Sequence, residues 1–296
     1  MSVHEGSLGT VLIERLEPSD MLETFSFLDR EPVLNVYLLA VLMRDALAPV
    51  RDEFWAARRD GQIAALVMLG TGSGSVLPAG DDHPALDRLA AHSIARLATL
   101  PPRFQVIGQR ASIAPFIERC ARAALVPRLE RDQTYMTLER AELSAFEPLP
   151  QLRPARTDDR ALIYESGARL RAEELDDDPR SSDPLAYSRR VDEECRDSLT
   201  FLWREHDELR FRASVSARTA DAAQISGVYT PPQWRRRGFA QRGVGELCRR
   251  LFEHSRAACL FVNDINAPAI AVYRRLGFTP RGRWGSAFYE RAPERP

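Results

Sequence analysis

The spacing of hydrophobic residues predicts an alternation of strands and helices along the chain. Short apolar runs such as Ile63–Leu69 have the length and composition of buried strands. In Pro32–Arg44 the apolar residues recur at every third or fourth position, as they do on one face of a helix. The predicted elements of the first half are strands at Val11–Leu16, Phe54–Ala57, Ile63–Leu69, Phe104–Gly108 and Thr134–Leu138, and helices that begin at Met21 or cover Pro32–Arg44, His83–Leu100 and Ser112–Ala123.

Two loops of this first half have clear composition signals. The Asp60-Gly61 pair between two apolar runs indicates a β-hairpin turn. Gly70–Gly80 is rich in glycine and serine and holds no basic residue, so we interpret it as a flexible connector.

A proline-rich stretch divides the chain into two parts. Residues 141–154 contain three prolines, which cannot continue a helix or a central strand. The sequence therefore predicts a linker at 141–154 between a domain at 1–140 and a second domain at 155–296. The predicted elements of the second domain are helices at Thr157–Glu174, Ala186–Arg196, Ala240–His254 and Pro268–Leu276, and strands at Leu199–Arg204, Leu209–Ala217, Ile225–Thr230, Cys259–Val262 and Ala287–Tyr289. The similar order in the two halves predicts a duplicated fold.

Composition narrows the possible functions. The chain has 296 residues, of which 44% are hydrophobic and 28% charged, as in ordinary globular proteins. It has no apolar run long enough to cross a membrane, and Met1–Ser7 lacks the features of a signal peptide, so we expect a cytoplasmic protein. The formal net charge of −1 argues against a DNA-binding protein and mildly against a tRNA-binding one.

The absence of lysine and the spacing of cysteine and histidine exclude several kinds of catalytic and metal site. Every basic residue other than histidine is arginine, so a catalytic lysine, a Schiff base and a lysine-containing P-loop are excluded. The four cysteines and five histidines are scattered without metal-ligand spacing, and no metal site is predicted.

The clearest chemical signal is a basic loop at the start of a helix. An apolar strand at Ile225–Thr230 is followed by Pro231-Pro232 and then by Gln233–Ala240, which reads Gln-Trp-Arg-Arg-Arg-Gly-Phe-Ala. A glycine-containing loop that opens a helix offers unpaired backbone N–H groups and the positive end of the helix dipole, which suits a phosphate or pyrophosphate. The alternative is a solvated arginine run in front of a surface helix.

A second motif follows at a regular distance. Asn266 is a good N-cap for a helix, Pro268 suits its first turn, and Gly277 supplies a left-handed C-cap. Tyr273 lies on the same face of this helix as Ala269.

Together the two motifs resemble those of the GNAT N-acetyltransferase superfamily. The acyl-CoA signature Arg/Gln-x-x-Gly-x-Gly/Ala is matched by Arg235–Ala240, and the second signature by Asn266, Ala269, Tyr273 and Gly277-Phe278. The residues at Gly227–Pro232 and Val262–Asn266 are also similar to those of a bacterial subgroup that has an uncharacterised N-terminal domain. The resemblance implies an α+β fold with two GNAT-like domains in tandem, each a mixed, mostly antiparallel sheet flanked by helices. The N-terminal domain has no such loop and is expected to be degenerate.

The resemblance also implies a donor, an acceptor and roles for named residues. The donor would be acetyl-CoA and the acceptor an unknown primary amine that attacks directly. The residues expected to bind the donor are Val228, Tyr229, Thr230, Arg235, Arg236, Arg237, Gly238, Phe239, Ala240, Asn263, Asn266 and Tyr273. Tyr273 would protonate the departing thiolate, and the Tyr229 amide would stabilise the oxyanion. The alternative for Tyr273 is a packed aromatic residue.

The general base is the open question. The strand before the loop reads Gln224-Ile-Ser-Gly-Val-Tyr229 and has no carboxylate, where many family members have a glutamate. Glu173, Glu174 and Asp264 are candidates, although solvated acids are the simpler interpretation, and a water relay needs no dedicated base. The missing carboxylate also favours a second hypothesis, a non-catalytic acyl-CoA sensor or interaction module. A tandem transferase that acts on aminoacyl-tRNA or a peptide is a third, and a homodimer is possible.

Overall fold

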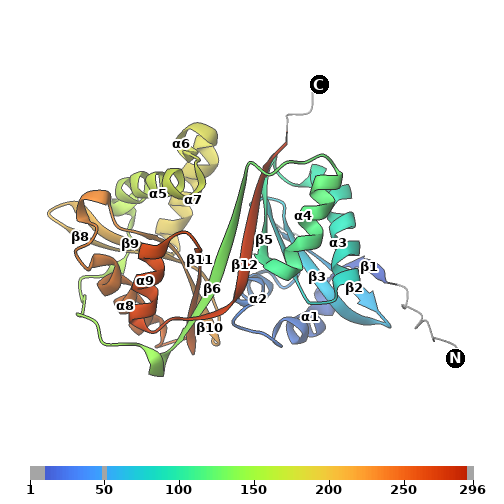
Figure 1. The fold of residues 1–296 in the computed structure, drawn as a ribbon, viewed down its shortest axis with the longest axis horizontal. Helices are drawn as coiled ribbons and strands as arrows, with labels where there is room; N and C mark the ends of the chain where they lie inside the picture. The colour runs from blue at the N-terminus through green and yellow to red at the C-terminus, as the bar shows by residue number, and fades with distance from the viewer. Residues whose placement is uncertain (1–10, 49–51, 292–296) are drawn as a thin grey trace. The chain divides into compact units, whose positions relative to one another are not determined.

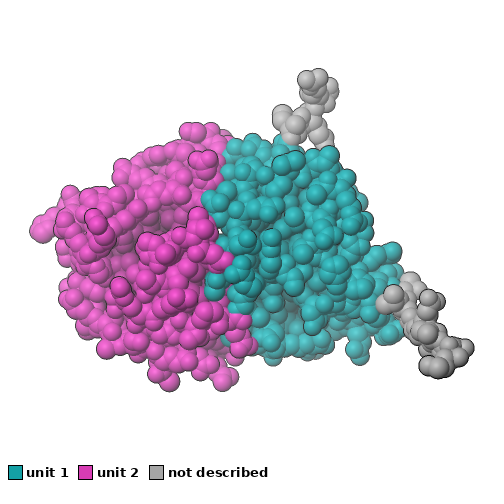
Figure 2. Space-filling model, in the orientation of Figure 1, with its two compact units in different colours: residues 1–134, 282–296 teal, residues 135–281 magenta. Residues whose placement is uncertain are grey.

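The chain forms two compact units, shown in different colours in Figure 2. The computed structural model describes residues 11–48 and 52–291, so the segment Met1–Ser7, predicted not to be a signal peptide, lies outside the described residues. Unit 1 contains residues 1–134 and 282–296, and unit 2 contains residues 135–281.

Unit 1 is a sheet covered by helices on both faces (Figure 1). Its strands pair in the order β1-β2-β3-β4-β5-β12, antiparallel except for the parallel pair β4–β5. The strands are β1 (Leu12–Arg15), β2 (Asp52–Arg59), β3 (Gln62–Gly70), β4 (Ser75–Ala79), β5 (Arg103–Gln109) and β12 (Thr279–Glu290), and the helices are α1 (Met21–Leu28), α2 (Val36–Asp45), α3 (His83–Ala95) and α4 (Arg110–Arg122).

The alternation of side chains along β3 explains the two layers of helices. Leu66 and Met68 pack with α1 and α2 on one face, while Val67 and Leu69 pack with α3 and α4 on the other. All four side chains are buried, because both faces of the sheet are covered.

The interpretation of Gly70–Gly80 as a flexible connector is wrong for about half of these residues. Strand β4 lies within it, pairing antiparallel with β3 and parallel with β5. The glycines hide a short apolar strand, and Gly74 is needed for close packing: it has a φ of +69°, and a Cβ there would lie 2.5 Å from the Arg103 carbonyl oxygen.

Unit 2 has the same kind of architecture. Its strands pair in the order β6-β11-β10-β9-β8-β7, and the pairs from β10 to β7 are antiparallel. Helices α5 and α7 share one hydrophobic core with the sheet, and α8 and α9 share the other. The strands are β6 (Leu129–Glu139), β7 (Arg153–Pro154), β8 (Thr200–Glu205), β9 (Glu208–Arg218), β10 (Ala222–Tyr229) and β11 (Ala257–Asn263), and the helices are α5 (Arg160–Leu175), α6 (Pro179–Ser182), α7 (Pro184–Arg196), α8 (Phe239–Leu251) and α9 (Ala267–Leu276).

The predicted linker is packed into unit 2. Leu149 and Leu152 are fully buried in the core that contains α8 and α9. The Ser144 amide donates to the Leu276 carbonyl at 3.0 Å, at the end of α9. Prolines do mark irregular backbone here, and Pro154 occupies the edge strand β7, where a missing N–H is tolerated.

The compact units also differ from the predicted domains at the C-terminus. The last strand is much longer than the predicted Ala287–Tyr289, and its residues Trp284–Glu290 pair antiparallel with Arg103–Gln109 of β5. Residues 282–296 therefore belong to unit 1, although they follow unit 2 in the chain. The predicted fold class is confirmed, since each unit is a mostly antiparallel sheet between helices.

Candidate active site

Strands β10 and β11 part before they end. They pair in parallel only from Ala222–Gln224 to Ala257–Cys259, yet β10 continues to Tyr229 and β11 to Asn263. The carboxyl-terminal part of β10 therefore offers backbone N–H and C=O groups on the edge that faces β11.

A β-bulge on the other side of β10 accompanies this separation. Ser226 pairs with Ser214 of β9 and Tyr229 with Arg212, so β10 has one residue more than β9 between the two pairs. Gly227 lies in this bulge with a left-handed φ of +58°. A bulge bends the strand that carries it, which turns the end of β10 away from its regular course.

The basic loop at the end of β10 has the geometry of an anion site. Arg236 and Gly238 both adopt left-handed backbone conformations, with φ of +60° and +80°. Gly238 is the N-cap of α8, and a Cβ placed there would meet nothing within 4 Å. The first N–H groups of α8 lack partners inside the helix, and the positive end of the helix dipole lies beside Gly238.

Aromatic side chains hold the loop in place. The Trp234 ring has two guanidinium groups over it, with the Arg210 Cζ 3.4 Å and the Arg237 Cζ 4.8 Å from its centroid. Phe239 packs edge-on against Trp203, with 4.8 Å between the ring centroids. The sequence motifs do not reveal Arg210 or Trp203 as neighbours of this loop, since both come from strands far earlier in the chain.

The second motif forms the predicted helix α9. The Asn266 side chain caps it by accepting from the Ala269 amide at 3.2 Å. At the other end Gly277 is left-handed, and the Phe278 amide donates to the Tyr273 carbonyl at 3.0 Å. Both predicted caps are confirmed.

Tyr273 lies in the core under this helix, beside Phe278. Burial raises the pKa of its phenol above the ordinary value, and the nearby Glu174 carboxylate and Cys248 thiol raise it further. Tyr273 therefore keeps its proton at neutral pH. Of the predicted bases, Glu174 at the end of α5 is the one whose charge raises the pKa of the predicted acid Tyr273.

Glu173, the other candidate base on α5, has a different neighbour. Its Oε2 accepts from Arg235 Nη2 at 2.6 Å in a half-exposed ion pair, and Arg235 Nε donates to the Thr230 carbonyl at 3.0 Å. No short-range pattern in the sequence indicates this pair, because its members are separated by 62 residues. Asp264, the third candidate, lies half-buried between β11 and α9.

Tyr229 points into the core that contains α5 and α7, with 4% of its surface exposed. Among the described residues its hydroxyl has no hydrogen-bond partner, and the same is true of the Thr230 hydroxyl. Burial raises the pKa of Tyr229, and the Glu173 carboxylate adds to the effect. The Thr230 hydroxyl is thus left for a ligand, while the Tyr229 hydroxyl lies beside the Glu173 carboxylate.

The remaining predicted residues lie on β10, on β11, at the start of α8 and on the loop that precedes α8. Val228 and Asn263 are half-buried, and Asn263 Oδ1 accepts from the Ile265 amide at 3.3 Å. Arg236 and Arg237 are exposed, and Phe239 and Ala240 are half-buried at the start of α8.

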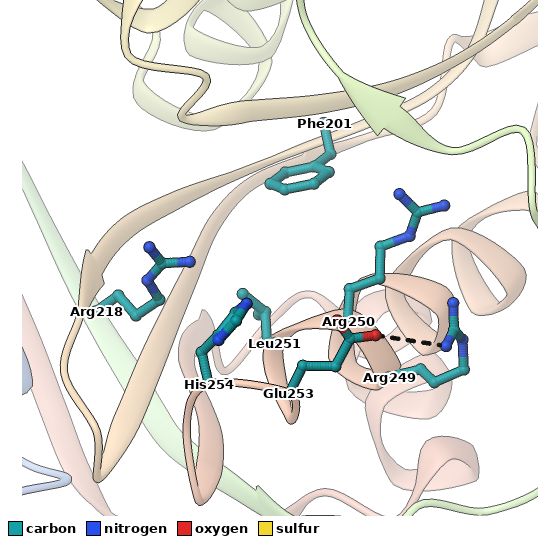
Figure 3. Close-up of a pocket in the computed structure, with 7 residues that line it drawn as sticks. All are labelled: Phe201, Arg218, Arg249, Arg250, Leu251, Glu253 and His254. Atoms are coloured by element: carbon teal, nitrogen blue, oxygen red, sulfur yellow. Dashed lines mark ion pairs between the residues drawn. The ribbon is translucent and has the colours of Figure 1, made fainter.

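A separate pocket of about 340 Å³ lies at the other end of α8 (Figure 3). It is lined by Phe201, Arg218, Arg249, Arg250, Leu251, Glu253 and His254. Arg249 and Arg250 are ion-paired with Glu246 at 2.8 and 3.1 Å, so much of the positive charge of this pocket is neutralised. None of the residues of the two motifs lines it.

The residues that the structure describes contain no cluster of three or more potential metal ligands. Among the helices of the described ranges, none is both long and apolar enough to cross a bilayer.

Comparison with known proteins identifies the fold. Residues 212–286 match the model of the family described as "FR47-like protein", a GNAT-like family. That segment contains β10, the loop, α8, β11 and α9. No curated protein matches the sequence.

Solved structures extend the likeness over the whole chain. A GCN5-related N-acetyltransferase from Sphaerobacter thermophilus has 19% identity and a TM-score of 0.59, with 96% of each chain covered. An acetyltransferase of the GNAT family from Colwellia psychrerythraea has 11% identity and a TM-score of 0.55, covering 95% of this chain and all of its own. A tandem GNAT protein of the clavulanic acid biosynthesis pathway has 16% identity and a TM-score of 0.54, covering 97% of this chain and all of its own.

The chain therefore has the GNAT fold in tandem. The resemblance predicted from Arg235–Ala240 and Asn266–Phe278 is confirmed, because the family match falls on the same segment.

Proposed function

We propose that unit 2 is an acyl-CoA-dependent N-acyltransferase that transfers acetyl from acetyl-CoA to a primary amine. The observation that carries the proposal is the parting of β10 and β11 after Gln224 and Cys259, with the open loop at Gly238 at its end. The carboxyl-terminal part of β10 thus has strand edge groups that β11 does not pair with, and they lie next to an anion site.

The donor fits this arrangement in two parts. The pyrophosphate would bind the amides of Arg236–Ala240, where the dipole of α8 favours negative charge and Gly238 leaves open space. The pantetheine arm, which contains amides, would pair with the backbone of Val228 and Thr230 and contact Asn263 and Asn266. The Thr230 hydroxyl, which has no partner among the described residues, lies along the same strand end.

The thioester supplies an activated acetyl group. Tyr273 would donate its proton to the departing thiolate, which its raised pKa permits because the phenol is neutral at pH 7. The Tyr229 amide, at the end of β10, would donate to the developing oxyanion.

Glu174 is the better candidate for proton removal from the acceptor. It lies close enough to Tyr273 for its charge to affect the phenol, whereas Glu173 is occupied by Arg235. A carboxylate from α5 would take the place of the glutamate that is missing from β10, where Gln224 donates to Ser216 Oγ at 2.8 Å.

Thermal unfolding with two donors tests the proposal. Acetyl-CoA at about a hundred times its dissociation constant should add about 2.7 kcal/mol to the free energy of unfolding. Acetyl-pantetheine, which lacks the pyrophosphate, should add less at the same concentration. Release of free thiol in the presence of a panel of primary amines then measures transfer. Absence of any stabilisation by acetyl-CoA contradicts the proposal, and stabilisation without transfer to any amine favours an acyl-CoA sensor.

A further inference from the structure

Three side chains from three elements meet beside the loop. Arg235 of the loop is held by Glu173 in the last turn of α5, at 2.6 Å, and by the Thr230 carbonyl at 3.0 Å. The Arg235 Cζ also lies 5.7 Å from the centroid of the Tyr229 ring. Arg235 is the first residue of the loop motif, so the ion pair ties α5 to the proposed donor site.

Glu173 competes with any anion that binds this loop. A carboxylate carries one negative charge and a pyrophosphate two, and a guanidinium binds phosphate oxygens in the same forked geometry as a carboxylate. The Arg235–Glu173 pair is exposed by 45% and 41% of its side-chain surfaces. An exposed pair of this kind contributes little free energy and can be exchanged for a stronger partner.

The Tyr229 hydroxyl offers Glu173 a second partner. It is buried and makes no hydrogen bond of ordinary geometry within the described parts of the chain, although the Glu173 carboxylate already lies beside it and helps to raise its pKa. A buried O–H without a partner costs free energy, which a hydrogen bond to the carboxylate would recover.

We propose that donor binding exchanges these partners: Arg235 leaves Glu173 for the pyrophosphate, and Glu173 accepts a hydrogen bond from the Tyr229 hydroxyl. Glu173 is then a positioning residue rather than the general base. It holds the loop arginine when the site is empty, and moves with its helix end towards β10 when the donor arrives. This inference rests on the proposed function, because the exchanging anion is the donor's pyrophosphate.

Calorimetric titration with acetyl-CoA tests the exchange through a double-mutant cycle. Glu173→Gln removes the competing negative charge but keeps a carbonyl oxygen that can accept from the Tyr229 hydroxyl. It should therefore tighten acetyl-CoA binding by about two- to fivefold, the range of an exposed ion pair. In the Arg235→Ala background the same substitution should have no effect. The matched control is Glu165→Gln, which removes a carboxylate from the same helix that pairs with Arg180 at 2.9 Å. It should leave affinity unchanged.

Tyr229→Phe tests the second half of the exchange. It should weaken acetyl-CoA binding by about two- to tenfold, the range of one hydrogen bond, while urea unfolding of the ligand-free protein stays unchanged or improves.

The outcomes separate the two proposals. If the wild type does not bind acetyl-CoA, the proposed function fails. If it binds, three results would each overturn the exchange: unchanged or weaker binding by Glu173→Gln, a gain that persists without Arg235, or unchanged binding by Tyr229→Phe. Weaker binding by Glu173→Gln would mean that Glu173 preorganises Arg235 for the donor.

Discussion

Gly238→Glu places a negative charge at the proposed pyrophosphate site without disturbing the core. A Cβ at position 238 meets nothing within 4 Å, so the new side chain enters open space. The backbone has a φ of +80°, and a non-glycine residue there costs about 1–2 kcal/mol. We therefore expect the variant to fold, with a modest loss in the free energy of unfolding.

The effect on donor binding should be much larger than this loss. Two unit charges about 4 Å apart repel by about 4 kcal/mol at the effective dielectric constant of a protein surface. At about 1.36 kcal/mol per factor of ten, that is about a thousandfold loss of acetyl-CoA affinity.

Gly238→Ala is the matched control, since it has the same backbone strain and no charge. Urea unfolding should give similar stabilities for the two variants, while calorimetric titration should show acetyl-CoA binding lost only with glutamate. Equal affinities of the two variants for acetyl-CoA would refute the placement of the pyrophosphate at this loop.

Three further predictions concern α9 and Tyr273. Tyr273→Phe should lower kcat for thiol release far more than it raises KM for acetyl-CoA; near-wild-type turnover would remove the proposed acid role. Because burial raises the pKa of Tyr273, the folded state holds the phenol proton more tightly than the unfolded chain does. The contribution of this proton to the free energy of unfolding is therefore complete below about pH 10 and declines as the pH rises further. Urea unfolding at about pH 9 and about pH 11 should show a smaller alkaline loss for Tyr273→Phe than for the wild type, and equal losses would contradict the shift. Gly277→Ala should cost more than about 2 kcal/mol in urea unfolding, because a left-handed residue would gain a Cβ 2.2 Å from the Glu142 carbonyl oxygen. Gly72→Ala, which meets nothing within 4 Å, should stay within about 0.5 kcal/mol; similar losses for both would show that the contact at Glu142 is relieved easily.

Local signals in the sequence predicted the parts of the site that depend on nearby residues. The caps of α9 at Asn266 and Gly277 follow from residue type and spacing alone, and the structure has both. The loop at Gly238 and the buried face of α8 were recognisable for the same reason, since a helix start and an apolar stripe are short-range patterns.

Pairings between distant residues could not be predicted in this way. Nothing in the surroundings of Glu173 indicates that Arg235 is its partner, and nothing near Trp234 indicates Arg210. Strand β4 was missed because a short apolar run between glycines has the composition of a loop, and only its pairing with β3 and β5 makes it a strand. The extent of β12 was missed for the same reason.

The pairing of β12 with β5 has a consequence for how the protein is made. In chain order, unit 2 is an insertion between the earlier strands of unit 1 and its last strand. On the ribosome, unit 2 can therefore fold before unit 1 has all of its strands, and β5 waits with an open edge until residues 282–290 have been synthesised. A fragment cut at the predicted linker would separate β12 from β5, so the two halves of this chain are not independent folding modules.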